Sequence, residues 1–533
     1  TEIYTLSLHD ALPIYGQWDW SKWDQTAATL ERHGLKWIPF LILGPAYSTP
    51  DWFREGEEHV GCVCLEHGIT SKIESLWNPF LKARVDRFLA TFAERYAATG
   101  ILESVNLGIQ GDFGEAIYSV AGTWTKNIPG DYHNHAGFWC GDEYAQADFR
   151  DWTRRKYGDL DLLNQAWGTQ YEDFETVDYP ARGEELPQVN VGVLDRTGQE
   201  RRRWLDFVTW YREAMTDLAD WWLADARRHF SNTQIYLCTG GDAQPTHGSQ
   251  FADQCRVAAA HGAGVRITNE GSDFAGNLMH TRWVASAGRY YGAYFGFEPA
   301  ALENELGAVA RIFNATTSGA VQLADKHYNT VKKPPQRAVI EAHLDYLYHV
   351  PKPQIHVALW YPNVTLTLEN SYLAHWGDAY LLRKLTDLDY VDESLLRAGA
   401  LANYPVMVLV HGQVMEPADA HRIADWVAAG GRLFVVNVPK LETVEGDALP
   451  EQLLFGETPG GRDLGKGSVE RCASLGELAP RLYATLDESG LPVVEQQHSG
   501  QVFASEVEPG RWLLFNAEET SSEARITTSE GTL

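Results

Sequence analysis

From Trp18 to about Pro351 the chain alternates helix-like segments with short apolar runs bounded by turn residues. The first run, Leu35–Leu43, is almost continuously apolar, which is typical of a strand buried on both faces of a parallel sheet. Regular alternation of helix and strand over such a length predicts a (β/α)8 barrel. The further predicted strands are 104–110, 233–240, 264–269, 290–297 and 318–325.

These six strands are two fewer than a closed (β/α)8 barrel contains. Because the missing strands belong at the start, we expect a barrel truncated at its N-terminal side, over residues 15–350, and open or patched there. Residues 1–14 resemble translated sequencing-adapter read-through and lack the basic start of a signal peptide; the alternative is an ordinary N-terminal strand. The localisation is therefore left open, with the cytoplasm favoured.

A second unit is predicted after Pro351, over residues 351–440. Strands at 355–362, 404–412 and 432–439 alternate with helices at 377–389 and 417–431, as in a flavodoxin-like or class I amidotransferase-like α/β domain. Gly430 and Gly431 end a helix rather than open one, so they do not form a phosphate loop. Residues 441–533 become Gly- and Glu-rich and then strand-like, which predicts an incomplete mixed or β domain.

Charge and aromatic content narrow the function class. The net charge of −28 comes without a basic stripe, which excludes a nucleic-acid partner. No apolar run reaches about 18 residues, so we expect no membrane span. The 19 Trp and 24 Tyr residues favour carbohydrate, because aromatic faces stack on the C–H faces of sugars, although any single Trp can equally fill a core.

The six cysteines are scattered and predict no metal site. Cys62 and Cys64 are too close together for the common structural zinc pattern, and no Cys-x-x-Cys pair accompanies them. We expect reduced thiols and no metal or cofactor.

Acidic residues follow four of the predicted barrel strands, where the function of such a barrel collects. Hydrolysis of a glycosidic bond needs two carboxyl groups across that bond, one protonated and one ionised. A single acidic residue at a strand end can equally well cap the next helix. Only the occurrence of acidic residues at four strand ends therefore indicates a catalytic site. The strand-end residues are Asp112 and Glu115, Asn269 and Glu270, Glu298, and Asp325 with His327.

Several neighbours of these acids are candidate substrate contacts with a structural alternative. Asp112 is favoured to bond the following helix rather than substrate, and for Asn269 a structural role in a turn has about even odds. His327 is expected to be a loop or supporting residue because no metal cluster accompanies it. Tyr118, Trp124 and Trp139 follow the first acids as candidate sugar platforms, and core packing is the commoner role for each.

Residues 149–180, "FRDWTRRKYGDLDLLNQAWGTQYEDFETVDYP", resemble the segment after the acid/base strand of family 42 glycoside hydrolases, the β-galactosidases. Residues 355–436 resemble the trimerisation domain of that family, and "SGAVQLADKHYN" at 318–329 resembles its last barrel strand. The resemblance implies a glycoside, oligosaccharide or polysaccharide substrate and a homotrimer. The zinc-site cysteines of that family are absent apart from Cys140, which again implies no zinc.

A second resemblance covers the first acid. Residues 18–42 and "NLGIQGDFGEAIYS" at 106–119 resemble family 14, the β-amylases, whose acid-bearing turn has the frame Gly-x-x-Gly-Glu-x-x-Tyr. Here that frame falls on Gly111, Gly114, Glu115 and Tyr118. Family 42 instead has Asn-Glu at this strand end, which this chain lacks.

Both resemblances imply Glu115 as the general acid, and they differ on its partner. Family 42 implies a nucleophile at Glu298 with retention of configuration, whereas the β-amylases imply a base at Glu270 with inversion. We favour Glu298, because the accessory domain and the 149–180 segment resemble family 42. A third hypothesis, from another class, is a carbohydrate-binding barrel that has lost catalysis.

Overall fold

The computed structural model forms two compact units, Thr1–Thr268 and Asn269–Leu533, each described here by itself. The residues described are 3–6, 16–44, 48–120, 133–187, 191–241, 244–269, 272, 274–299, 304–323, 332–347, 351–369, 372–449, 460–496, 501–518, 520–529 and 531–532.

A parallel sheet runs through the first unit in the order β1-β2-β5-β6-β7. Both β2 and β5 are buried along their whole length, as expected for strands covered on both faces. The four strands predicted in this unit are confirmed, three of them with shorter bounds and the one at 264–269 with the same bounds. The strands are β1 (Ile3–Leu6), β2 (Ile38–Ile42), β5 (Ser104–Gly108), β6 (Gln234–Thr239) and β7 (Gly264–Asn269).

β1 falls inside the segment predicted to be foreign and pairs in parallel with β2. Its backbone agrees with the alternative of an ordinary N-terminal strand. A two-stranded antiparallel hairpin, β3 (Gly61–Val63) and β4 (Thr70–Glu74), follows β2 and was not predicted.

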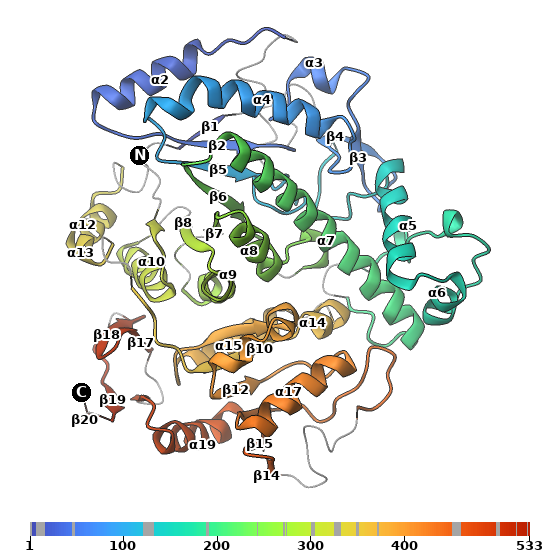
Figure 1. Cartoon of the computed structure of the whole chain (residues 1–533). Coiled ribbons are helices and arrows are strands. Elements are labelled where there is room, and N and C mark those ends of the chain that lie inside the picture. The colour runs from blue at the N-terminus through green and yellow to red at the C-terminus, as the bar shows by residue number, and fades with distance from the viewer. Residues whose placement is uncertain are drawn as a thin grey trace. The chain divides into compact units, whose positions relative to one another are not determined.

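The helices of the first unit connect successive strands (Figure 1). The longest, α7, begins with a capping box between Thr197 and Glu200. At the start of the first helix the Ser21 backbone N–H donates to Asp19 Oδ1 at 3.0 Å. The helices are α2 (Ser21–Arg32), α3 (Asp51–Arg54), α4 (Leu81–Tyr96), α5 (Glu143–Tyr157), α6 (Leu160–Trp167), α7 (Gly198–His229) and α8 (Phe251–Ala260), with 3₁₀ turns at Ala97–Thr99, Phe174–Thr176, Gly183–Glu185 and Pro245–His247.

In the second unit, the last two predicted barrel strands form a parallel pair, β8 (Tyr294–Pro299) and β9 (Gln322–Leu323). β8 starts later than expected because the preceding helix continues to Tyr291. The accompanying helices are α9 (Phe274–Tyr291), α10 (Glu305–Ser318), α12 (Pro334–Ala342) and α13 (Leu344–Leu347).

The predicted α/β domain contains a sheet of order β11-β10-β12-β13-β15-β14, in which only β14 is antiparallel. Gly430 ends a helix with a positive φ of 132°, so the predicted helix stop is confirmed. The sheet extends past residue 440, because β15 pairs with β13. Its strands are β10 (Val357–Tyr361), β11 (Asp389–Asp392), β12 (Val406–Leu409), β13 (Arg432–Val436), β14 (Gly461–Leu464) and β15 (Gly467–Cys472).

The C-terminal end of the helix predicted at 377–389 was wrong. The helix, α15 (Tyr372–Arg383), stops six residues before Asp389, which instead opens the buried strand β11. The other helices of this domain are α14 (Asn363–Glu369), α16 (Glu393–Arg397), α17 (Pro417–Ala429) and α19 (Leu475–Glu488), with a 3₁₀ turn at Ala400–Asn403.

The chain finishes in small antiparallel sheets, as the strand-like C-terminal sequence predicts. Phe503 and Phe515 of these strands pack with Phe274 and Phe313 in one apolar cluster. The strands are β16 (Val493–Gln496), β17 (Val502–Glu508), β18 (Arg511–Asn516), β19 (Ala524–Thr528) and β20 (Gly531–Thr532). Among the described helices, none combines the length and apolar character needed to cross a lipid bilayer.

Candidate active site

Glu115 stands on a tight turn at the carboxyl end of β5. The chain reverses after Gln110, so that the Ile109 N–H donates to the Gly114 carbonyl at 3.1 Å and the Gly111 N–H donates to the Glu115 carbonyl at 2.9 Å. Gly114 has a φ of +92°, and a Cβ there would lie 2.7 Å from Ile42 Cδ1. Only glycine fits this position, both for its backbone conformation and for its close approach to β2.

The Glu115 side chain is buried, with 6% of its surface exposed. Its Oε2 accepts a hydrogen bond from the Phe113 N–H at 3.0 Å. The next residue is anchored on the neighbouring strand, because the Ala116 N–H donates to the Cys238 carbonyl at 2.8 Å and Gln254 Nε2 donates to the Ala116 carbonyl at 2.8 Å. The carboxyl group is therefore held at the carboxyl edge of the parallel sheet, where barrel enzymes keep their catalytic side chains.

Gly111 lies directly against this carboxyl group. A Cβ at Gly111 would lie 2.4 Å from Glu115 Oε2 and 2.9 Å from Glu115 N. We expect Gly111→Ala to displace the carboxyl group and lower kcat/KM at least about 10²-fold, since a misplacement of about 1 Å has that effect. Steady-state kinetics together with the circular dichroism spectrum check this. Gly377→Ala is the control, because a Cβ at Gly377 meets nothing within 4 Å; equal activity of both variants would contradict the assigned position of Glu115.

Asp112 supports the turn. It is buried, and Ser119 Oγ lies 3.1 Å from its Oδ1 and 2.6 Å from Asn134 Oδ1, either of which can accept the single hydroxyl hydrogen. These contacts connect the turn to Ser119 and Asn134, and the structural role favoured for Asp112 stays a prediction.

Tyr118 and Trp139 are fully buried in the core of the first unit. The Tyr118 hydroxyl donates to the Tyr211 carbonyl at 3.0 Å, and the two rings stack with centroids 3.7 Å apart. Trp139 Nε1 donates to the Ser119 carbonyl at 3.0 Å. Core packing accounts for both residues, so we carry neither forward as a sugar platform.

The remaining predicted site residues are only partly described. Asn269 ends β7, and Glu298 is the last residue but one of β8, so the backbone of each stands at a strand end as predicted. Trp124, Glu270 and His327 lie outside the described residues.

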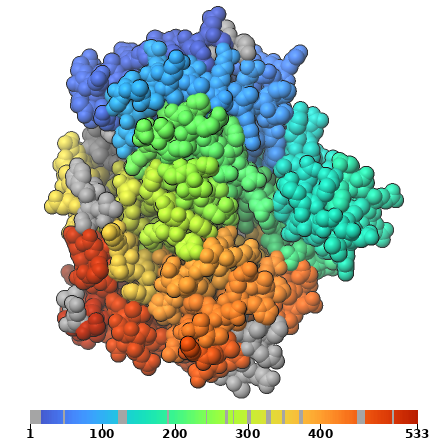
Figure 2. Space-filling view, viewed as in Figure 1, coloured from blue at the N-terminus to red at the C-terminus, as the bar shows by residue number. Residues whose placement is uncertain are grey.

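The segment that resembles family 42 is organised by a buried carboxylate on α7. Asp206 accepts hydrogen bonds from Lys156 Nζ at 2.7 Å, from the Tyr157 hydroxyl and from Trp167 Nε1 at 2.9 Å. The segment forms a lobe around α5 and α6 that projects from the first unit (Figure 2). The motif is thus scaffolding for α5 and α6.

The comparisons with known proteins divide between two families. The family model "Glycosyl hydrolase family 14" matches residues 72–243. The thermophilic β-amylase of Thermoanaerobacterium thermosulfurigenes is 23% identical over 215 residues, covering 38% of this chain and 36% of that protein. The β-galactosidase of a Thermus species is 29% identical over 179 residues, covering 32% of this chain and 24% of that protein. The chain thus matches about a third or less of the length of these relatives.

Nearly the whole chain superposes on a solved structure. A catalytic mutant of a GH42 β-galactosidase from G. stearothermophilus aligns with 98% of this chain and 89% of its own, with a TM-score of 0.73 and 12% sequence identity. The fold is that of a family 42 β-galactosidase. The predicted barrel with a following α/β domain is confirmed, and so is the mixed resemblance to families 42 and 14.

The sequence prediction overlooked one cluster of donor atoms. Cys64, His67, His133 and His135 each offer one metal-ligand atom, and these atoms all lie within 4.8 Å of one another. Burial, followed by the nearby charges of His135 and His67, lowers the pKa of His133. The signals were Cys-x-x-His at 64–67 and His-x-His at 133–135, which were passed over because only the spacing of cysteines was considered.

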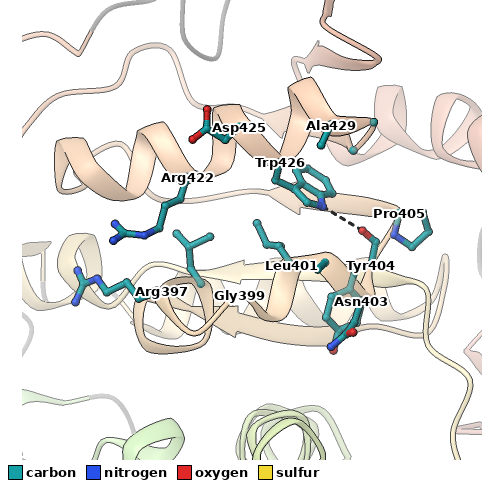
Figure 3. A pocket seen from close by; sticks show the side chains of 14 residues that line it. Arg397, Gly399, Leu401, Asn403, Tyr404, Pro405, Arg422, Asp425, Trp426 and Ala429 are labelled. Atoms are coloured by element: carbon teal, nitrogen blue, oxygen red, sulfur yellow. Dashed lines mark hydrogen bonds between the residues drawn. The ribbon is translucent and has the colours of Figure 1, made fainter.

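A hollow of about 860 Å³ lies in the second unit between α16, the following 3₁₀ turn and α17 (Figure 3). Trp426 crosses it, with Nε1 donating to the Tyr404 carbonyl at 3.3 Å. Tyr404 lies just before β12, and Gly431 lies directly before β13. The hollow therefore opens at the amino ends of these two strands. Ligands of open α/β sheets bind at the carboxyl ends, so we assign no site there.

Proposed function

We propose that the chain is a glycoside hydrolase, a retaining exo-enzyme of the β-galactosidase type, with Glu115 as general acid and base. The observation that carries the proposal is the position of Glu115: a buried carboxyl group on a glycine-framed turn at the carboxyl end of a parallel barrel strand. The family 14 match, which covers this strand, supports it, and so do the partial matches to a β-amylase and to a β-galactosidase.

In the proposed first step, protonated Glu115 donates its proton to the glycosidic oxygen while the Glu298 carboxylate attacks the anomeric carbon and the C–O bond to the leaving group breaks. In the second step, ionised Glu115 takes a proton from water, whose oxygen displaces Glu298 from the anomeric carbon. The Phe113 N–H, which donates to Glu115 Oε2 at 3.0 Å, stabilises the ionised form that the second step requires and holds the carboxyl group in one orientation.

Glu298 is the proposed nucleophile because the likeness of fold to a GH42 β-galactosidase extends over nearly the whole chain. The alternative, an inverting β-amylase-like hydrolase with Glu270 as base, is supported by the family 14 match. That match ends at residue 243, before both glutamates, so it does not discriminate between them. A homotrimer is proposed with it, on the resemblance of residues 355–436 to the trimerisation domain of family 42.

The configuration of the first-formed sugar distinguishes the two mechanisms. A panel of aryl glycosides and maltooligosaccharides is hydrolysed while the anomers are followed by nuclear magnetic resonance. We expect retention, with Glu298→Gln losing about 10³-fold or more in kcat and Glu270→Gln retaining substantial turnover. If the configuration is inverted, and Glu270→Gln loses the activity while Glu298→Gln keeps it, the second catalytic carboxyl group is Glu270 instead of Glu298. No hydrolysis of any substrate, combined with measurable sugar binding, would favour a non-catalytic carbohydrate-binding barrel.

A further inference from the structure

Phe113 is the exposed residue of the turn that carries Glu115. From Ser104 to Ser119 every other residue is buried, Asp112 and Glu115 included, whereas 41% of the Phe113 surface is exposed. Among the described aromatic residues of the first unit, only Phe80 is exposed to a similar extent. The usual order, with acidic residues at the surface and phenylalanine inside, is therefore reversed on this turn.

The conformation of the turn does not require phenylalanine. The Gly114 N–H donates to the Gly111 carbonyl at 2.7 Å, which closes a β-turn with Asp112 and Phe113 as its central residues. Neither central residue has a positive φ. Polar residues and glycine are the usual choice in such turns, so the large exposed ring at Phe113 calls for a reason other than backbone geometry.

The ring is held at a fixed place beside the carboxyl group. The Phe113 N–H donates to Glu115 Oε2 at 3.0 Å, and the Gly111 N–H donates to the Glu115 carbonyl at 2.9 Å. The start of the turn is anchored as well, because Gln110 Nε2 donates to the Glu74 carbonyl at 2.6 Å. Phe113 and the Glu115 carboxyl group therefore belong to one rigid turn, which lowers the entropic cost of binding a ligand against the ring.

We propose that Phe113 is the aromatic platform of the leaving-group subsite, where its ring stacks on the C–H face of the departing sugar. This inference rests on the proposed function, in which Glu115 protonates the glycosidic oxygen. The exposed Phe113 ring lies nearer to solvent than the buried Glu115 carboxyl group. An exo-enzyme holds the terminal sugar deepest, so the part of the substrate that extends from the scissile bond towards solvent is the leaving group.

The contact exists only when the leaving group carries a ring. A glycosyl fluoride places no ring beside Phe113, whereas the glucose of lactose does. Substitution of the Phe113 side chain leaves its backbone N–H in place, so the bond to Glu115 Oε2 is kept. The platform therefore acts on the binding of the leaving group and not on the proton transfer by Glu115.

The test compares lactose with β-galactosyl fluoride, using the full 533-residue chain. We expect Phe113→Ala to lower kcat/KM for lactose by about 10-fold and to leave kcat/KM for the fluoride unchanged, while Phe113→Tyr keeps both values. The melting temperature checks that each variant is folded. Leu35→Ala is the control for truncating an exposed apolar side chain, because Leu35 is 43% exposed and precedes β2 at the amino edge of the sheet. It should match the wild type on both substrates.

The outcomes separate this inference from the proposed function. If the wild type hydrolyses lactose and Phe113→Ala matches it, or if Phe113→Ala loses as much with the fluoride as with lactose, the platform is overturned and the proposed function stands. If the wild type hydrolyses neither substrate, the proposed β-galactosidase activity fails, and calorimetric binding of lactose and of maltotetraose decides on the platform. Binding about 10-fold weaker in Phe113→Ala than in Leu35→Ala supports it, and equal binding, or no binding to either variant, overturns it.

Discussion

Glu115→Gln is expected to lower kcat/KM for glycoside hydrolysis by about 10²–10⁴-fold, the range for loss of a general acid or base. Glutamine has the same shape, and its amide oxygen can still accept the Phe113 N–H that now bonds Glu115 Oε2. The fold should therefore be preserved, while the side chain can neither donate a proton to the leaving group nor take one from water. Steady-state kinetics on aryl glycosides with leaving groups of different pKa measure the loss.

The pattern of losses identifies the role. In Glu115→Gln, the rate of the bond-breaking step should fall less for substrates whose leaving groups need little protonation. Added azide should restore turnover in this variant, because azide attacks without the general base that water needs. Glu103→Gln is the matched control, because Glu103 directly precedes β5 at its amino end, where its Oε2 accepts from Ser104 Oγ. Activity of Glu115→Gln equal to that of Glu103→Gln would rule out Glu115 as the acid.

The position of Glu115 was predictable because it depends on local sequence. An apolar run buried on both faces specifies β5, and the spacing of Gly111 and Gly114 specifies the turn that follows. The burial of Tyr118 was harder to predict from the sequence, because Tyr118 packs against Tyr211. This residue lies on α7, more than ninety positions later in the chain. Core packing was the commoner expected role for Tyr118, but the sequence does not identify the residue against which it packs.

The Cys64 and His133 pairing was beyond the sequence prediction for a similar reason. Their approach requires the β3–β4 hairpin, whose strands are short and carry no strong alternation of apolar residues. β11 was missed because "DYVD" has an acid at each end and follows a helical pattern, so it resembles a helix terminus. Its first acid is buried only because arginines of α9 neutralise it, which is a tertiary contact.

Substitution of that acid, Asp389, is expected to cause a large loss of stability. It is buried, Ser286 Oγ donates to its Oδ1 at 2.9 Å, and the Tyr404 hydroxyl donates to its Oδ2 at 2.9 Å. Arg289 donates to it directly, and Arg282 Nη1 lies 3.8 Å away. Asp389→Asn is expected to lower the free energy of unfolding of the second unit by up to about 3–5 kcal/mol, because it removes the carboxylate that pairs with Arg289. Arg282 keeps a second carboxylate partner, Asp387, at 3.2 Å. Denaturant titration with hydrogen exchange at β10 and β11 measures the loss.

Glu341→Gln is the control for removing one charge from a surface pair. Glu341 Oε1 accepts from Arg337 Nε at 2.7 Å on α12, with both side chains more than half exposed, so its removal should cost about 0.3–0.5 kcal/mol. A loss in Asp389→Asn no larger than this would mean that the buried ion pairs do not stabilise the sheet, as happens when desolvation equals the Coulombic gain.

The pH dependence of stability separates lost charge from lost packing at Asp389. Burial acts to raise the pKa of Asp389, but the charges of Arg289 and Arg282 outweigh burial and hold the pKa below its usual range. A group with a lowered folded-state pKa stabilises above its unfolded pKa, about 3.9 for Asp, and loses that contribution as the pH falls through the folded value. The stability difference between wild type and Asp389→Asn should therefore be constant near neutral pH and shrink below about pH 4. A difference that stays unchanged in acid would assign the loss to hydrogen bonding and packing instead of charge.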